Sequence, residues 1–197
     1  MRKKSWKQRG PRPGAEREER PQKPLDPEKA REKTMQRAIK LLAAKPRSIA
    51  ELRERLLEKQ WANETAVDAV VEKLREYGYL NDERFAFSFA SYKVRQKPVG
   101  RGRLRRDLQL KKVDKETADE ALKLVFEEMP EEQLIDRAIE KRTRLRGRPQ
   151  TRAEIKSLYD HLLRRGFSYE LVSQKVRAAS GASLEEEEQS GIQSLES

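Results

Sequence analysis

Apolar residues between positions 27 and 179 recur every three or four positions, and almost none alternate with a period of two. This spacing places them on one face of a helix, so the pattern predicts an all-α protein. Short stretches that are polar or contain proline or glycine divide the pattern into nine segments. The predicted helices span residues 27–43, 48–59, 64–76, 82–96, 101–111, 115–128, 131–145, 152–165 and 169–179.

Residues suited to capping precede many of these segments. Asp26 followed by Pro27 gives an N-cap with proline at the first helical position. Ser48 with Glu51, and Thr151 with Glu154, have the spacing of capping boxes, in which a hydroxyl and a carboxylate satisfy free amides. Three further N-caps are predicted at Asn63, Asp114 and Ser168.

The nine predicted helices form a threefold repeat. Shifted by 52 residues, Leu52, Leu56, Lys59, Trp61 and Glu64–Ala66 fall on Leu104, Leu108, Lys111, Val113 and Glu116–Ala118. Shifted by 106 residues, Leu52, Leu56, Trp61, Glu64 and Val70 fall on Leu158, Leu162, Phe167, Glu170 and Val176. Each unit therefore has three helices and a large apolar residue in the turn before the third. The predicted divisions are an arm (1–26), repeat 1 (27–81), repeat 2 (82–129), repeat 3 (130–180) and a tail (181–197).

Residues 78–92 are unusually aromatic, with three of the five phenylalanines and two of the five tyrosines. Gly78 fits a left-handed helix end, and Asn81 fits the next N-cap. Leu80 and Phe85 flank that cap as a hydrophobic staple, and Phe85, Phe89 and Tyr92 follow at helical spacing. Such stripes are usually core, so packing between repeats is favoured over stacking on bases. The predicted inter-repeat joint consists of Gly78, Leu80, Asn81, Phe85, Phe89 and Tyr92.

Composition narrows the class of protein. No apolar run approaches the roughly 18 residues that a membrane span needs, and no apolar signal segment follows the basic N-terminus. The absence of cysteine fits a reducing cytoplasm, so we expect a cytoplasmic protein. Residues 1–25 and the acidic tail are too polar to bury a core, and both are predicted to be disordered.

The net charge of +11 is unevenly distributed. Residues 1–33 carry +6 and residues 181–197 carry −5, which leaves +10 on the helical body between 34 and 180. Solvation of helix faces alone does not require such an excess. A polyanionic partner is therefore expected, with nucleic acid first.

Nothing in the sequence indicates catalysis. The single histidine, His161, lies in the middle of a predicted helix, and Gly100-Arg101-Gly102 lacks the strand that precedes a phosphate-binding loop. The carboxylates lie among Lys and Arg residues, and their spacing singles out no metal-binding set. We expect a protein that is not an enzyme and has no cofactor and no metal.

Two basic runs mark equivalent places in repeats 2 and 3. Residues 93–112 hold nine bases and one acid, and residues 137–152 hold seven bases and one acid. Each run spans the end of a unit's first helix, the loop and the start of the second. The candidate binding residues are Lys93, Arg95, Lys97, Arg101, Arg103, Arg105, Arg106, Lys111, Lys112, Arg142, Arg144, Arg146, Arg148 and Arg152.

Two partners remain open for these runs. In a helix-turn-helix protein the recognition helix enters the major groove, but the equivalent segments, 64–76 and 115–127, each carry four acids against two bases. Sequence-specific recognition is therefore disfavoured, and DNA would be contacted through its phosphates. The alternative is an acidic protein surface, toward which the bases would steer docking.

The chain also resembles a known family. GYLNDERFA at 78–86, KPRS at 45–48, GRGRLRRDL at 100–108 and RRGFSY at 164–169 are similar to the motifs of RecX proteins, the bacterial regulators of RecA recombinase. The resemblance covers about residues 34–180. Gln60 and Lys112 depart from it, because family members often have glycine ahead of the turn residue.

The resemblance implies three tandem three-helix repeats that form an elongated, curved helical solenoid. It also implies binding to the RecA filament on single-stranded DNA, mostly with inhibition of ATPase and strand exchange in recombination, DNA repair and the SOS response. Apart from the resemblance, we expect a monomer. Double-stranded DNA is a second expected ligand. The alternative is a sequence-non-specific DNA-binding protein that acts without RecA.

Overall fold

The computed structural model describes residues 26–180, and these residues form nine helices and no strand. The helices are α1 (Pro27–Ala44), α2 (Ile49–Leu57), α3 (Glu64–Glu76), α4 (Asp82–Gln96), α5 (Arg101–Leu110), α6 (Lys115–Glu128), α7 (Glu131–Arg146), α8 (Arg152–Arg164) and α9 (Tyr169–Ser180). The all-α prediction is confirmed, and the predicted helix ends are correct to within two residues. Residues 1–25 and 181–197, where disorder was expected, lie outside the described residues.

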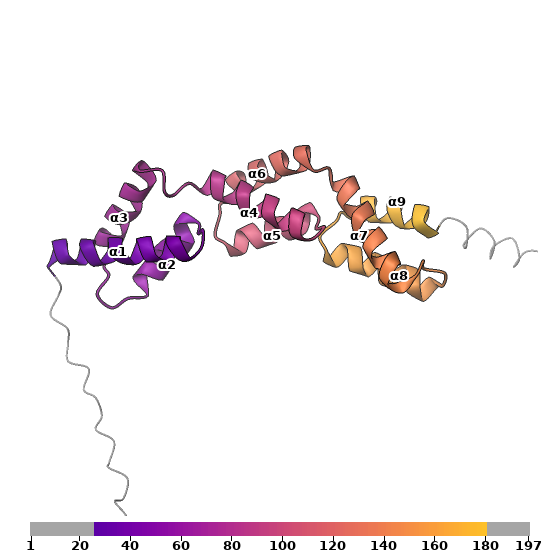
Figure 1. Cartoon of the computed structure of the whole chain (residues 1–197), viewed down its shortest axis with the longest axis horizontal. Coiled ribbons are helices and arrows are strands. Elements are labelled where there is room, and N and C mark those ends of the chain that lie inside the picture. The colour runs from indigo at the N-terminus through magenta and orange to yellow at the C-terminus, as the bar shows by residue number, and fades with distance from the viewer. Residues whose placement is uncertain (1–25, 181–197) are drawn as a thin grey trace, which may run out of the picture.

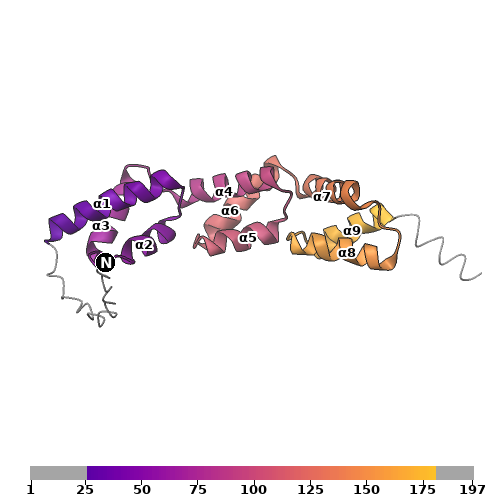
Figure 2. The same ribbon diagram turned by 60° about the horizontal axis from the view of Figure 1, so that its bottom comes forward.

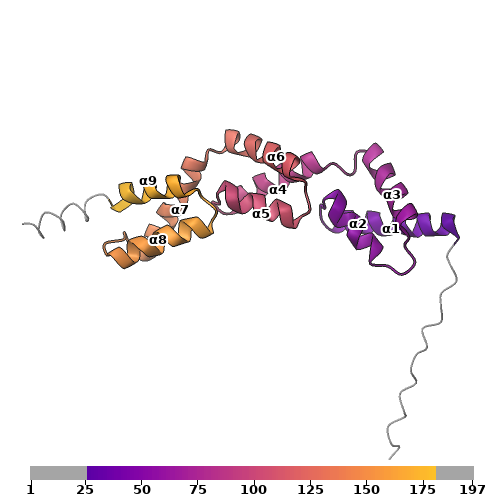
Figure 3. The ribbon, with the colours of Figure 1, turned by 180° about the vertical axis from the view of Figure 1, so that it is seen from behind.

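The helices pack in threes along one axis (Figure 1). Within each of the three units, every helix contacts the other two. The view from behind shows α1 and α9 at opposite ends of the row (Figure 3), and a tilted view separates the three units (Figure 2). The described chain is therefore an elongated, gently curved row of three-helix units.

Local capping fixes where the helices begin. The side chains of Asn63, Asn81 and Asp114 each accept a hydrogen bond from the backbone amide three residues later. Thr151 and Glu154 form the full reciprocal capping box. At Ser48 only the hydroxyl half forms, because the carboxylate of Glu51 binds basic side chains instead. The capping box predicted at Ser48 is therefore half correct.

Equivalent positions of the repeat occupy equivalent places in the core. Two leucines from the second helix of each unit are almost completely buried: Leu52, Leu56, Leu104, Leu108, Leu158 and Leu162. The turn residues Val113 and Phe167 are also buried, whereas Trp61 is half-buried. Full burial of a leucine side chain stabilises a fold by about 1.5–3 kcal/mol, so these six positions are a large part of what holds the units together.

The three units do not share one core. Buried residues of α4 to α9 form a continuous hydrophobic cluster that joins the second and third units. The first unit has a cluster of its own, which includes Leu52, Val67 and Leu80. The first junction must therefore be held by other contacts than a shared core.

Glycines bring the backbones of the second and third units together. The amide of Gly100 donates to the carbonyl of Arg165 at 3.0 Å, and the amide of Gly102 donates to the carbonyl of Gly166 at 2.9 Å. Gly166 has a φ of 86°, and a Cβ atom there would lie 2.2 Å from the backbone nitrogen of Arg103. Only glycine fits both the left-handed backbone and this close approach.

The first junction uses equivalent positions but polar side chains. The hydroxyl of Ser48 donates to the carbonyl of Lys111, and the amide of Ile49 donates to the Asp82 carboxylate at 2.9 Å. Lys112, the counterpart of Gly166, has a φ of 59° and is the single non-glycine residue with positive φ in the described chain. The departure from glycine noted in the sequence is therefore a point where the backbone is strained.

The predicted aromatic joint needs correction. Gly78 has the expected left-handed backbone, Leu80 is buried, and Asn81 caps α4. However, Phe85 and Phe89 are only partly buried, and Tyr92 is 62% exposed. The face of α4 that packs inward consists of Ala86, Ala90, Ser91 and Val94. The small side chains let α4 approach α6 closely, which leaves the rings at the side of the interface rather than within it.

Candidate binding surface

Most bases of the run in the second unit have an acidic partner. Lys93 and Arg103 both contact Asp107, at 3.8 and 3.1 Å, and Arg105 contacts Asp119 at 2.7 Å. Ion pairs of this exposed kind contribute about 0–1 kcal/mol, but they lower the net charge that a polyanion meets. The sequence predicted a binding role for all of these bases, but their ion pairs largely neutralise Lys93, Arg103 and Arg105.

Lys111 and Lys112 connect the first two units. Lys111 Nζ lies 3.1 Å from the carboxylate of Glu51, and Lys112 Nζ lies 2.7 Å from that of Glu54. Glu51 also binds Arg47 at 2.7 Å, so it is shared between units. These contacts give the two lysines a role in the junction, and we leave both out of the proposed binding surface.

Four bases of that run have no carboxylate within ion-pair distance among residues 26–180. Arg101 lies over the ring of Phe126, with its guanidinium carbon 4.8 Å from the ring centroid. Arg106 donates to the carbonyl of Gly102 at 3.2 Å. Arg95 and Lys97 are exposed at the end of α4, and Lys97 precedes Pro98, whose carbonyl accepts a hydrogen bond from Arg165 of the third unit. These four remain available to a negatively charged partner.

The run in the third unit is less neutralised. Arg144 pairs with Glu140 at 2.6 Å on the surface of α7. The remaining predicted residues, Arg142, Arg146, Arg148 and Arg152, have no ion-pair partner in the part of the chain that the structure describes. Burial and the nearby charges of Arg146, Arg164 and Arg165 lower the pKa of Arg142. Four of the five predicted bases of the third unit therefore keep an uncompensated positive charge.

Sequence reasoning missed part of this cluster. Lys141 and Arg164 face the same hollow between α7 and α8 as Arg142 and Arg146. Arg165 completes it and donates to the carbonyl of Pro98 at 2.9 Å, which brings it next to Lys97 of the second unit. The sequence shows two adjacent bases, Arg164 and Arg165, which could have indicated this part of the cluster. The contact between Arg165 and Pro98 joins residues 67 positions apart, so sequence spacing could not reveal it.

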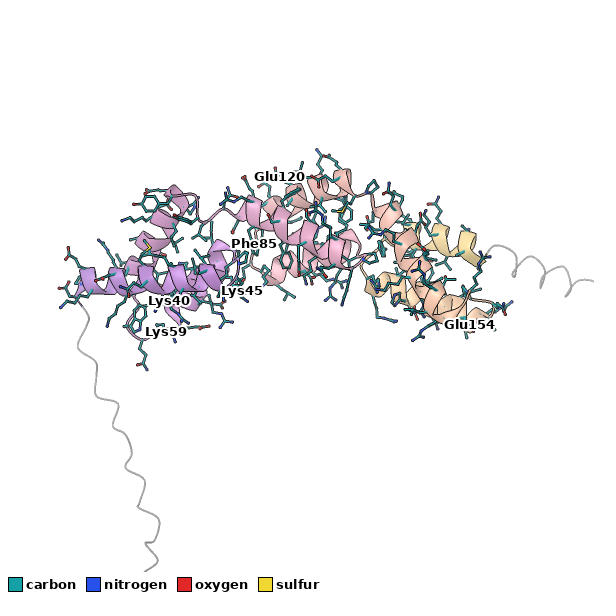
Figure 4. The ribbon with its side chains drawn as sticks, in the orientation of Figure 1. Lys40, Lys45, Lys59, Phe85, Glu120 and Glu154 are labelled. Carbon is teal, nitrogen blue, oxygen red and sulfur yellow. The ribbon has the colours of Figure 1, made fainter. Side chains whose placement is uncertain are left out.

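A second feature is an open groove of about 1310 Å³ between the first two units. Phe85 and Phe89, which stack with centroids 5.8 Å apart, form part of one wall. Tyr77, Tyr79 and Tyr92 are exposed along it, and basic side chains also line it. Lys93 Nζ, for example, lies 5.3 Å from the ring centroid of Phe89. Figure 4 shows Phe85 and Lys45, which both line the groove, at this junction.

Comparison with known proteins identifies the family. The models of the first, second and third three-helix domains of RecX match residues 35–74, 81–122 and 130–176. The chain belongs to the RecX family. The three matched segments correspond to the three observed units, and the resemblance carried by the sequence motifs is confirmed.

Relatives named regulatory protein RecX support this assignment. The chain is 33% identical to the one from Prosthecochloris aestuarii over 142 residues, which are 72% of this chain and 90% of the relative. It is 35% identical to the one from Treponema pallidum over 135 residues, 68% of this chain and 78% of the relative. The match with the Bacillus pumilus protein, at 25% identity, covers 81% of this chain and 60% of that relative.

Solved structures of RecX proteins share the fold. The Lactobacillus salivarius structure superposes with a TM-score of 0.68 at 19% identity, and covers 77% of this chain and 97% of its own. A second RecX crystal structure gives a TM-score of 0.64 at 21% identity, with 75% and 71% covered. No helix among residues 26–180 is both long enough and apolar enough to cross a membrane.

Proposed function

We propose that this protein binds the filament that RecA forms on single-stranded DNA and modulates, mostly by inhibition, its ATPase and strand exchange. Membership of a family of regulatory proteins makes a regulatory role the starting point. A non-catalytic, monomeric and cytoplasmic protein acting in recombination, DNA repair and the SOS response fits this role.

The observation that carries the proposal is the position of the unpaired bases. Lys97 at the end of α4 and Arg148 and Arg152 around the start of α8 are exposed, and none has an ion-pair partner among the described residues. They belong to units that share one hydrophobic core, so their relative placement is fixed. An elongated body with fixed charges along it suits a long, periodic, negatively charged partner better than a small one.

The test compares two variants with the same loss of charge. In the first, Lys97, Arg148 and Arg152 become glutamine. In the control, glutamine replaces three arginines of the first unit that form ion pairs, Arg53, Arg55 and Arg75. We expect the first variant to need on the order of tenfold more protein to inhibit the DNA-dependent ATPase of RecA, with a flatter salt dependence. We expect the control to resemble the wild type.

Equal inhibition by both variants would remove the basic surface from the proposal. The assay also needs DNA in excess over RecA. Inhibition that persists under excess DNA identifies the filament as the target. Inhibition that added free DNA titrates away would instead show that the protein coats the strand, and the filament proposal would be wrong.

The aromatic groove favours a second candidate function, sequence-non-specific DNA binding without RecA. Exposed aromatic rings close to basic side chains are typical of proteins that bind single strands, because each nucleotide base can stack on a ring while its phosphate meets a cation. Replacing Tyr77 and Tyr79 with alanine would then weaken binding to oligothymidylate in the absence of RecA. Unchanged binding would exclude this groove as a strand-binding site.

A further inference from the structure

A small cavity of about 360 Å³ lies between α7 and α8 in the third unit. The two helices lie next to each other at the C-terminal end of the described chain (Figure 1). Its charged and titratable lining consists of Lys141, Arg142, Arg146, His161, Arg164 and Arg165. Five of these side chains are cationic, and they converge from two helices and the turn that follows α8.

No carboxylate from residues 26–180 lines this cavity. Two carboxylates of α7 are paired outside it: Glu140 pairs with Arg144 at 2.6 Å, and Asp136 pairs with Lys175 at 2.7 Å. Like charges gathered in a partly enclosed space repel one another, and this repulsion opposes folding unless a negative group offsets it. The cavity therefore has the electrostatics of a site for an anion.

Hydrogen bonds hold several cationic groups in place. The Arg165 guanidinium donates to Nε2 of His161 at 3.0 Å and to the carbonyl of Pro98 at 2.9 Å. Arg142 donates to the hydroxyl of Ser157 at 2.8 Å. His161 can accept the hydrogen bond from Arg165 only while its ring is neutral. Burial first, and then the charges of Arg165 and the neighbouring arginines, lower its pKa to about 4, which keeps the ring neutral at physiological pH.

We propose that this cavity binds a phosphate group. Guanidinium groups match the oxygens of phosphate through paired hydrogen bonds, and a group with several acceptor oxygens can engage more than one of them at once. Because hydrogen bonds already hold Arg142 and Arg165 in place, phosphate binding would cost less side-chain entropy than binding to mobile side chains.

The surroundings extend this site toward the surface. A second hollow of about 180 Å³ shares Arg142, Arg146 and Ser157 with the cavity and continues to Arg148. Its lining also includes the carboxylate of Glu154, which accepts hydrogen bonds from the amides of Gln150 and Thr151. A phosphate in the backbone of a nucleic acid and a free phosphate both offer the required oxygens. The inference does not depend on RecA, because it concerns this chain and a phosphate alone.

The chain offers a direct probe, because His161 is its only histidine. The ring nitrogen resonances of His161 in the full-length protein, labelled with ¹⁵N at histidine, are followed at pH 7 during titration with inorganic phosphate. Sodium chloride at the same ionic strength is the reference. We expect a saturable change with phosphate and none with chloride, and in phosphate the pKa of His161 should rise from about 4 toward its ordinary value.

Two exposed arginines of the cavity, Arg146 and Arg164, are replaced together with glutamine. We expect at least a tenfold loss of apparent phosphate affinity. The matched control is Arg144→Gln, on the same helix but paired with Glu140 and outside the cavity, and it should titrate like the wild type. Identical titrations for the wild type and the double variant, or a chloride effect equal to that of phosphate, would overturn the proposal.

A final arm identifies the source of the phosphate. Oligothymidylate of ten nucleotides is added before inorganic phosphate. If it blocks the change at His161, the site binds the backbone of a nucleic acid; if phosphate still titrates normally, the site binds the free anion. The double variant is also assayed on RecA ATPase. Normal inhibition by a variant that has lost phosphate binding would leave the proposed filament function intact.

Discussion

Replacing Gly166 with alanine is expected to destabilise the joint between the second and third units by about 2–5 kcal/mol. The first contribution is the left-handed backbone at φ 86°, which costs a residue with a Cβ atom roughly 1–2 kcal/mol. The second is overpacking, typically about 1–3 kcal/mol, because the new Cβ would lie 2.2 Å from the nitrogen and 2.8 Å from the Cα atom of Arg103. These are backbone atoms of α5, so they cannot rotate away as a flexible side chain could.

The matched control is Gly78→Ala. Gly78 has a similar φ of 71°, but a Cβ atom there would meet nothing within 4 Å. It should therefore lose only the backbone contribution, about 1–2 kcal/mol. Urea unfolding of both variants, followed by circular dichroism at 222 nm, gives the two free energies of unfolding. Equal losses in the two variants would refute the conclusion that close backbone contact at Gly166 holds these units together.

Three further predictions concern the first junction and His161. Lys112→Gly should raise the free energy of unfolding by up to about 1 kcal/mol in urea, because relief of the positive φ outweighs the exposed pair with Glu54. A lower free energy of unfolding for Lys112→Gly than for the wild type would show that the backbone at Lys112 is not strained. Burial raises the pKa of Asp82, although the hydrogen bond that its carboxylate accepts from the amide of Ile49 opposes this. The folded state therefore binds the proton more tightly than the unfolded state, and the wild type should gain stability relative to Asp82→Asn as the pH falls from 6 toward 3. A stability difference between the two proteins that does not change with pH would contradict this. The pKa of His161 is lowered to about 4, so the unfolded state binds more protons than the folded state between pH 6.5 and 4. As the pH is lowered through this range, the free energy of unfolding should fall more for the wild type than for His161→Gln. Parallel curves of stability against pH would show that the ring is not held neutral.

Much of the fold could be predicted because its determinants are local. The caps at Asn63, Asn81 and Asp114 act over three residues, and the paired leucines of each second helix define a buried face over a single turn. The repeat was visible for the same reason, since each unit uses the same local pattern. The aromatic stripe was misplaced because helical spacing shows that a face exists, but not which of two adjacent faces packs inward.

The candidate site was harder to predict, because a base is available only if no acid reaches it. Lys111 is 60 residues from Glu51, and the two meet only when the first two units are assembled. Arg165 lies 67 residues from Pro98, and their contact places the cationic cavity beside Lys97. Charge counts along the sequence located the basic regions but not the bases that remain unpaired.

The sequence by itself determined the helices, their caps, the threefold repeat and the family, because hydrogen bonds and apolar periodicity within a few residues encode them. Tertiary structure alone decided that the aromatic rings line an open groove, that two lysines join the first two units, and that six charged or titratable side chains line one cavity. Those outcomes depend on distances between residues far apart in the chain, which are set by how the units pack and by the close backbone contact that glycine permits at one junction and lysine strains at the other.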